Sequence, residues 1–164
     1  MSDRTADELA IRNLVAQLAW HADNTGVDDL DAYVDCFTPD AEWEMRGDVR
    51  RGHDAIRQGA IARRESGSMG PGTKIAHFLS MSVVAFDDDD TARVKSYVQA
   101  YRDADANPTI TVMGQYHDVY RRHDGSWKLH RRYVDFTWNP GETRREPHST
   151  TAQAAGPQPK EQAV

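Results

Sequence analysis

The histidine at position 77 has the residue type and the surroundings of a catalytic base. Residues 75–86 are rich in apolar and β-branched side chains, which predicts a β-strand. The neighbours on its strand face are Ile75, Leu79, Met81 and Val83. None of these can accept a hydrogen bond, and burying an imidazole without a partner costs about 1–3 kcal/mol. A backbone carbonyl as acceptor would make His77 a core residue, and a side-chain acceptor would make it a candidate base.

Arg132 is a second candidate, because it interrupts an apolar and aromatic row. On the strand expected at 127–138 it shares a face with Val134, Phe136 and Trp138. A guanidinium in such a row is unfavourable unless it meets a carboxylate or an anionic ligand group. A structural ion pair, or a side chain that extends to solvent from the edge of the sheet, would also explain it.

Asp23 and Tyr116 are of residue types that occur in catalytic sites, but their positions in the sequence do not show that they belong to one. Asp23 ends the first expected helix, where the negative end of the helix dipole gives a carboxylate no benefit. Residues 24–26 are typical of an ordinary surface loop, and spacing alone cannot bring Asp23 near His77. Tyr116 lies on the strand expected at 110–122, where most buried tyrosines are packing groups with a satisfied hydroxyl.

These residues must be positioned by helices in the first part of the chain and strands in the second. The expected helices span about 5–22, 27–37 and 53–64, and the expected strands span 41–46, 75–86, 91–102, 110–122 and 127–138. The first helix is expected to begin with a capping box at Thr5–Glu8, and the second to stop at Pro39. The expected connections between elements are a turn at 47–52, a mobile glycine-rich loop at 66–72, a solvated acidic hairpin tip at 87–90 and a hairpin turn at Asp124-Gly125. Tyr97, Gln99 and Tyr101 form a further polar row on one of the strands.

Segregated helices and strands predict an α+β fold. We expect a cone-shaped barrel, in which a strongly curved and mainly antiparallel sheet holds about three N-terminal helices against its concave face. Residues 1–141 would form this single domain, and 142–164, which lack periodicity, are expected to be a disordered tail. The mouth of such a cone is the usual place for a small molecule.

Composition excludes several classes of partner. The net charge of −6 argues against a nucleic-acid binder, and the pairs Arg50–Arg51, Arg63–Arg64 and Arg121–Arg122 are interpreted as solvated surface. Cys36 is the single cysteine and is expected to be a buried structural thiol in a reducing, cytoplasmic environment. The N-terminus lacks the order of a signal peptide, and no apolar run reaches the roughly 20 residues needed to cross a membrane. The seven histidines show no ligand spacing, so neither metal nor organic cofactor is expected.

Five segments of the chain resemble SnoaL-like proteins, a branch of the nuclear-transport-factor-2-like superfamily. They are Ala19-Trp-His-Ala-Asp23, Phe37-Thr-Pro-Asp-Ala-Glu-Trp43, Ala76-His77-Phe78, Gly114-Gln-Tyr116-His-Asp118-Val-Tyr120 and Asp124-Gly-Ser-Trp127-Lys-Leu-His-Arg-Arg132. The resemblance covers roughly residues 8 to 139. The most similar patterns are those of scytalone dehydratase, hexachlorocyclohexane dehydrochlorinase and bile-acid dehydratases.

The resemblance implies a histidine base, His77, oriented by Asp23. Arg132 falls on an assisting arginine and would stabilise negative charge on an enolate or leaving oxygen, and Tyr116 would donate a further hydrogen bond. The side chains expected to line the pocket are Trp43, Met45, Leu18, Leu79, Met81, Tyr97, Gln99, Val134 and Phe136. Leu18 stands where the dehydrochlorinase pattern has a lysine, which argues against a halide leaving group. Homo-oligomers, trimers or dimers, are expected for related barrels.

The function expected is that of a cofactor-independent lyase, which removes water or another β leaving group from a small, cyclic, apolar molecule. A double-bond isomerase or polyketide cyclase would use the same scaffold. A non-catalytic ligand-binding protein, or a structural subunit similar to the β subunits of ring-hydroxylating oxygenases, is the alternative from another class. An epoxide hydrolase would need a second carboxylate in the pocket, for which the sequence offers no clear candidate.

Overall fold

The computed structural model of the protein describes residues 3–136, so Trp138 and the expected tail at 142–164 lie outside the described residues. Its elements in chain order are α1 (Arg4–Asn24), η1 (Val27–Asp29), α2 (Asp31–Val34), β1 (Phe37–Met45), β2 (Asp48–Arg51), α3 (Gly52–Glu65), β3 (Ala76–Phe86), β4 (Thr91–Arg102), β5 (Thr109–His123) and β6 (Ser126–Asp135). The expected order of helices followed by a long antiparallel array is confirmed.

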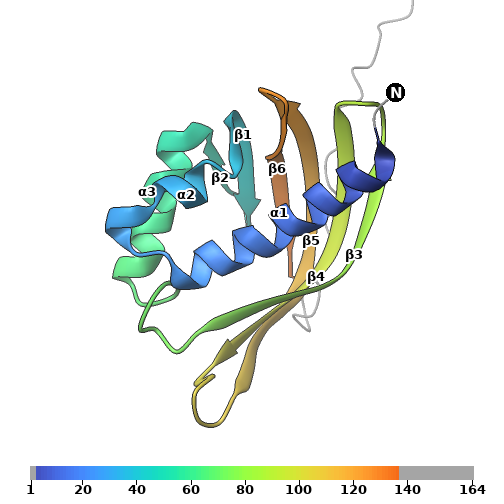
Figure 1. Cartoon of the computed structure of the whole chain (residues 1–164). Coiled ribbons are helices and arrows are strands. Elements are labelled where there is room, and N and C mark those ends of the chain that lie inside the picture. Colours follow the sequence, from blue (N-terminus) through green and yellow to red (C-terminus); the bar gives the residue numbers. More distant parts are fainter. Residues whose placement is uncertain (1–2, 137–164) are drawn as a thin grey trace, which may run out of the picture.

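The strands of the described chain form one mixed sheet in the order β2-β1-β6-β5-β4-β3. Its parallel pairing joins β1 to β6, and the other neighbours are antiparallel. The sheet curls around α1, while α2 and α3 gather at its β1 end (Figure 1). This arrangement confirms the expected α+β cone with its helices against the concave face.

Helix α1 begins one residue before the expected capping box. Its N-cap is Asp3, whose Oδ1 accepts hydrogen bonds from the backbone N–H groups of Thr5, at 3.1 Å, and Ala6, at 3.2 Å. Thr5 therefore lies inside the first turn, and the predicted box is wrong, because an aspartate caps a helix at least as well as a threonine. The side chains that α1 buries are Asp7, Ile11, Leu14, Val15, Leu18 and Ala22.

The helix expected over 27–37 is wrong in its second half. Its first part forms η1 and the single turn α2, and β1 already begins at Phe37, which pairs with Leu129 of β6. Pro39 therefore lies within a strand rather than at a helix stop, inside the register shift of this pairing, where its missing N–H interrupts no regular ladder. Cys36 is buried as expected, and burial raises the pKa of its thiol to about 11.

The expected turn over 47–52 is also too long, because it contains strand β2. The reversal between β1 and β2 is made by Arg46 and Gly47, whose φ angles of 52° and 84° are both positive. Two left-handed residues give the turn that matches the twist of a hairpin. The same geometry recurs at Asp124 and Gly125, as the sequence predicts.

The burial pattern of β4 identifies the face of the sheet that is turned inward. The buried residues are Ala92, Val94, Ser96, Val98 and Ala100. Tyr97 and Gln99 alternate with these and point to the outer face, where Tyr97 is 40% exposed. Their predicted place in the pocket lining is therefore wrong. The expected face of β3 is wrong at Val83, which is exposed, because a bulge between Ser80 and Val83 changes the parity of the strand.

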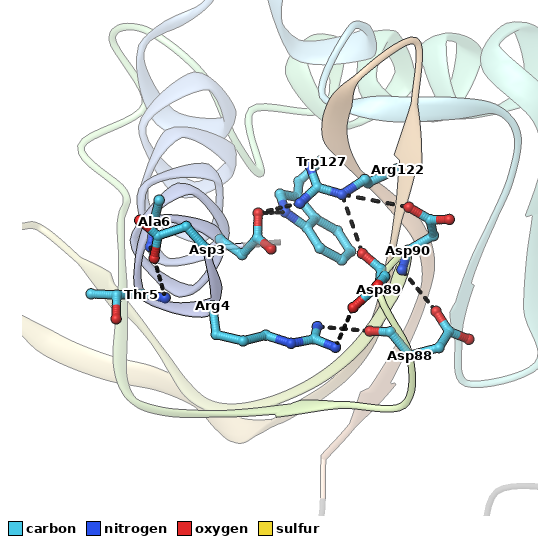
Figure 2. A network of polar contacts seen from close by, with 10 residues as sticks. Asp3, Arg4, Thr5, Ala6, Asp88, Asp89, Asp90, Arg122 and Trp127 are labelled. Carbon is cyan, nitrogen blue, oxygen red and sulfur yellow. Dashed lines mark hydrogen bonds and ion pairs between the residues drawn. The ribbon is translucent and has the colours of Figure 1, made fainter. Parts of the chain in front are cut away.

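A polar network fixes the first turns of α1 to the far end of the sheet (Figure 2). Asp7 accepts hydrogen bonds from the indole Nε1 of Trp127, at 3.0 Å, and from Arg122. Arg4 donates to the Asp88 carbonyl at 2.7 Å and to the Asp89 carboxylate at 2.8 Å. The acidic tip at 87–90 is exposed as predicted, and it is also a docking point for the helix.

Asp7 gives this anchor a defined dependence on pH. The hydrogen bond from Trp127, and then Arg122, lower the pKa of Asp7 below its ordinary value of 3.8. A lowered folded-state pKa adds stability that is present above pH 3.8 and is lost as pH falls through the folded value. We expect Asp7→Asn to lower the urea midpoint by a constant amount between pH 5 and 7, and by less below about pH 4. A difference that persists unchanged at pH 2.5 would contradict this account, and Asp124→Asn on an exposed hairpin is the control.

Candidate functional site

Asp23 and His77 are in direct contact, although 54 positions separate them in the chain. Asp23 lies in the last turn of α1, and His77 is the second residue of β3. Asp23 Oδ1 lies 2.5 Å from His77 Nδ1, and Asp23 Oδ2 accepts the backbone N–H of His77 at 2.7 Å. The side chains are 14% and 16% exposed, respectively. The acceptor that the sequence required for His77 is therefore a carboxylate rather than a backbone carbonyl.

The two bonds to Asp23 determine which nitrogen of His77 is available. A carboxylate facing Nδ1 favours the tautomer that carries its proton on Nδ1. Nε2 then presents its lone pair, and no bond from Nε2 to another side chain occurs within residues 3–136. The second bond, to the backbone of the same residue, prevents the carboxylate from rotating away. The arrangement can therefore take up a proton at Nε2 and stabilise the resulting imidazolium.

Arg64 holds the turn of α1 that carries Asp23. Its guanidinium donates to the carbonyls of Thr25 at 2.6 Å, His21 at 3.0 Å and Ala22 at 3.3 Å. Carbonyls at the end of a helix lack partners within it, and a cation there also complements the helix dipole. Desolvation lowers the pKa of Arg64, and the nearby charge of Asp23 acts in the opposite direction. The prediction that Arg63 and Arg64 are solvated surface is thus wrong, since both are half-buried.

Arg132 lies on the inner face, but its charge already has a partner. Its Nε and Nη2 donate to the two carboxylate oxygens of Asp118 at 2.9 and 2.7 Å. The side chains of Arg132 and Asp118 are 6% and 0% exposed. Asp118 also accepts the Tyr120 hydroxyl at 3.2 Å. Of the alternatives left open by the sequence, the structure shows the structural ion pair.

The strand register separates this ion pair from the dyad. His77 lies opposite Ala100 of β4, whereas Asp118, the partner of Arg132, lies opposite Val94. Six residues of strand separate those two positions, or roughly 20 Å along the strand direction. Arg132 therefore belongs to a different level of the cone from His77.

Tyr116 lies between these levels on the same inner face. The guanidinium carbon of Arg132 lies 4.1 Å from the centre of its ring, a cation–π contact. Burial raises the pKa of the Tyr116 phenol, and the positive charge of Arg132 opposes that rise. The hydroxyl is thus a proton donor at neutral pH, which is the state in which it can support an oxygen of a ligand.

The structure places some of the other residues predicted to line the pocket in the interior and some outside it. Those that pack in or against the core are Leu18, Trp43, Met45, Leu79, Val134 and Phe136. Tyr97 and Gln99 lie on the other face, and the side chain of Met81 lies outside the described part of the protein. Phe136 reaches the interior by crossing Gly114, where an added Cβ would lie 2.5 Å from the Asp135 carbonyl oxygen. Gly114 is therefore required for this approach of the two backbones.

Three interior charged residues that the sequence did not single out are Asp118, Arg63 and Arg64. A signal for Asp118 was present, since Tyr116, Asp118 and Tyr120 alternate along one strand face. The signal for Arg63 and Arg64 was their helical spacing: they lie three and four residues after Ala60, which places them on the buried face of α3. Both signals require knowing which face of the element is turned inward.

Substituting Arg64 tests its role as the clamp on α1. Arg64→Met keeps the length of the side chain but leaves the α1 carbonyls without their donor. Loss of charge-assisted hydrogen bonds in this half-buried position should lower the free energy of unfolding by about 2 kcal/mol. Urea denaturation followed by circular dichroism measures the effect. Arg57→Met, on the same helix and paired with exposed Asp31, should change stability by less than about 0.5 kcal/mol. Equal effects would refute the clamp.

A double-mutant comparison tests whether Arg132 acts as half of a structural pair. Asp118→Asn or Arg132→Met alone leaves one buried group uncompensated and should cost about 3–5 kcal/mol. The double variant Asp118→Leu with Arg132→Met removes both charges and should recover most of that loss. Additive losses in urea denaturation would show that the two side chains do not act as a pair.

In residues 3–136, no helix combines the length and apolar character needed to cross a membrane. The same part of the chain contains no group of three or more histidine, cysteine, aspartate or glutamate side chains placed to hold a metal ion.

Comparisons with solved structures place the fold among known proteins. A candidate scytalone dehydratase from Novosphingobium aromaticivorans is 21% identical, with a TM-score of 0.60 over 80% of this chain and 84% of that one. A candidate aromatic ring hydroxylase from the same organism is 28% identical, with a TM-score of 0.61 over 81% and 90%. Aln2 from Streptomyces is 20% identical, with a TM-score of 0.67 over 83% and 93%.

A search of curated proteins found no match to the sequence. The sequence pattern of the SnoaL-like domain matches residues 3–133, which include every helix of the structure and nearly all of its sheet. The resemblance noted in the sequence is thereby confirmed at the level of the family and the fold. The chain belongs to the SnoaL-like domain family.

Proposed function

We propose that this protein is a cofactor-independent lyase of the dehydratase type. The observation that carries the proposal is the paired contact of Asp23 with the Nδ1 atom and the backbone N–H of His77. It is supported by a family whose members include dehydratases, isomerases and polyketide cyclases, and by a structural relative described as a candidate scytalone dehydratase.

His77 acts as the base in this proposal. Its Nε2 takes a proton from a substrate carbon, the electron pair of the broken C–H bond forms a C=C bond, and the bond to a β oxygen breaks. The departing oxygen receives the proton back from Nε2 and leaves as water, so charge and atoms balance. Asp23 holds the imidazole in the required tautomer and stabilises the imidazolium between the two transfers.

The surroundings of the dyad favour an apolar ring as substrate. The inner-face neighbours of His77 along β3 and β4 are Leu79, Val98 and Ala100. An apolar wall binds ring carbons by excluding water, and it strengthens the interaction of Asp23 with a developing imidazolium. Tyr116 is the candidate donor to an oxygen of the substrate. Arg132 has a smaller part than the sequence implied, because its charge is balanced by Asp118.

Turnover by base-deficient variants tests the proposal. Hydroxylated steroids, terpenoids and polyketide-derived ring alcohols are screened for loss of water by mass spectrometry, with the wild-type protein and with His77→Gln and Asp23→Asn. General-base catalysis contributes about 10²–10⁴-fold, so both variants should lose at least about 10²-fold in kcat. His123→Gln, on the exposed end of β5, is the matched control.

The same assay in D₂O distinguishes a lyase from an isomerase or a cyclase. Deuterium that enters the substrate carbon without loss of water indicates an isomerase or cyclase that shares the proton abstraction. A folded His77→Gln protein with undiminished turnover refutes the mechanism, and failure of the wild-type protein to exchange or convert any substrate favours a non-catalytic binding protein. Circular dichroism confirms folding in each case. The homo-oligomer and the cytoplasmic location expected from the sequence stay predictions.

A further inference from the structure

The buried face of α3 ends in two arginines instead of apolar residues. The inward positions along the helix are Ile56, Gly59, Ala60, Arg63 and Arg64. This spacing of three and four residues defines a single helix face, so both side chains leave α3 on the side of its buried residues. That of Arg64 binds the carbonyls at the end of α1. The guanidinium of Arg63 makes no such bonds within the part of the chain that the structure describes.

Arg63 is a half-buried cation for which residues 3–136 provide no polar side-chain partner. Its guanidinium carbon lies 4.7 Å from the ring centre of Trp43, a buried side chain on the inner face of β1. Its Nε is buried and has no hydrogen-bond partner, and no carboxylate within residues 3–136 forms an ion pair with it. An unsatisfied charged donor is costly, and the contact with the Trp43 ring replaces only part of its lost hydration. The position thus favours a group that supplies the missing acceptor.

The neighbours of Arg63 connect it with the proposed site. Burial raises the pKa of Tyr116, and the positive charges of Arg132 and then Arg63 act against that rise. Trp43 lies opposite Arg132, and the next inner residue of β1, Met45, lies opposite Val134, which pairs with Tyr116. Arg63 therefore contacts the inner face at the level of Arg132, one inner position along the strands from the level of Tyr116.

We propose that Arg63 binds a carboxylate carried by the ring of the substrate. The inference rests on the proposed function of the site and specifies its substrate class as an apolar ring acid. A guanidinium offers parallel N–H donors that match the two oxygens of a carboxylate, and the Arg63 guanidinium contacts the Trp43 ring. Arg132 is unsuited to this role, because Asp118 already occupies two of its donors.

Binding of a matched pair of probes tests the proposal without any turnover. Benzoate and benzamide have the same ring and nearly the same shape, but only benzoate is charged at neutral pH. Wild-type protein should bind benzoate at least about tenfold more tightly than benzamide, since a charge-assisted hydrogen bond contributes about 1.5–3 kcal/mol. Isothermal titration calorimetry measures both dissociation constants. Arg63→Gln should bind the two probes equally.

Three further variants make the result decisive. Arg63→Lys keeps the charge but not the paired donors, so it should retain a smaller preference for benzoate and shows that the site still folds. Arg57→Gln, on the outer part of the same helix, should behave as the wild type. His77→Gln should also keep the preference, which separates the carboxylate site from the proposed lyase activity. A preference for benzoate that survives in Arg63→Gln, or its absence from the wild type, overturns the proposal.

Discussion

Asp23 connects the last turn of a long helix to the first residues of a strand, and the position of the candidate base depends on that connection. Helix α1 has 21 residues, about 31 Å, and crosses the concave face of the sheet (Figure 1). At one end Asp7 and Arg4 bind the β5–β6 and β3–β4 hairpins. At the other, Arg64 binds its carbonyls and Asp23 binds His77. A helix held at both ends cannot slide, so the geometry of the dyad is set by contacts made along its whole length.

Much of the fold follows from local patterns, because alternation and helical spacing depend on neighbouring residues alone. The alternation over 41–46 correctly turns Trp43 and Met45 inward. Alternation defines two faces but does not say which is buried, and Tyr97 was assigned to the wrong one. The charged residues on its own face, Arg93 and Lys95, mark that face as the outer one. A bulge such as the one before Val83 has no comparable sequence signal, since it depends on the pairing with β4.

The site is less predictable than the fold, because its contacts join distant segments. No local pattern relates Asp23 to His77; the family resemblance alone related them, and the bond itself requires the helix to end where β3 begins. The partner of Arg132 was harder to find for a different reason. The sequence shows that a buried guanidinium needs an acceptor, but the choice of Asp118 follows from the β5–β6 register, in which the two residues lie directly opposite. Because of that register, Arg132 forms a structural ion pair with Asp118 instead of remaining a candidate catalytic cation.

Charge balance distinguishes the interior arginines from one another. Arg132 is matched by a carboxylate and Arg64 by carbonyl oxygens, whereas Arg63 has an aromatic ring and no oxygen within the described residues. The chain as a whole carries a net charge of −6, which repels anions at long range. Salt screens that repulsion beyond about 8–10 Å, while a partly desolvated guanidinium acts strongly at contact. An acid that reaches Arg63 would therefore be retained by short-range bonds, and its apolar ring would determine whether it enters at all.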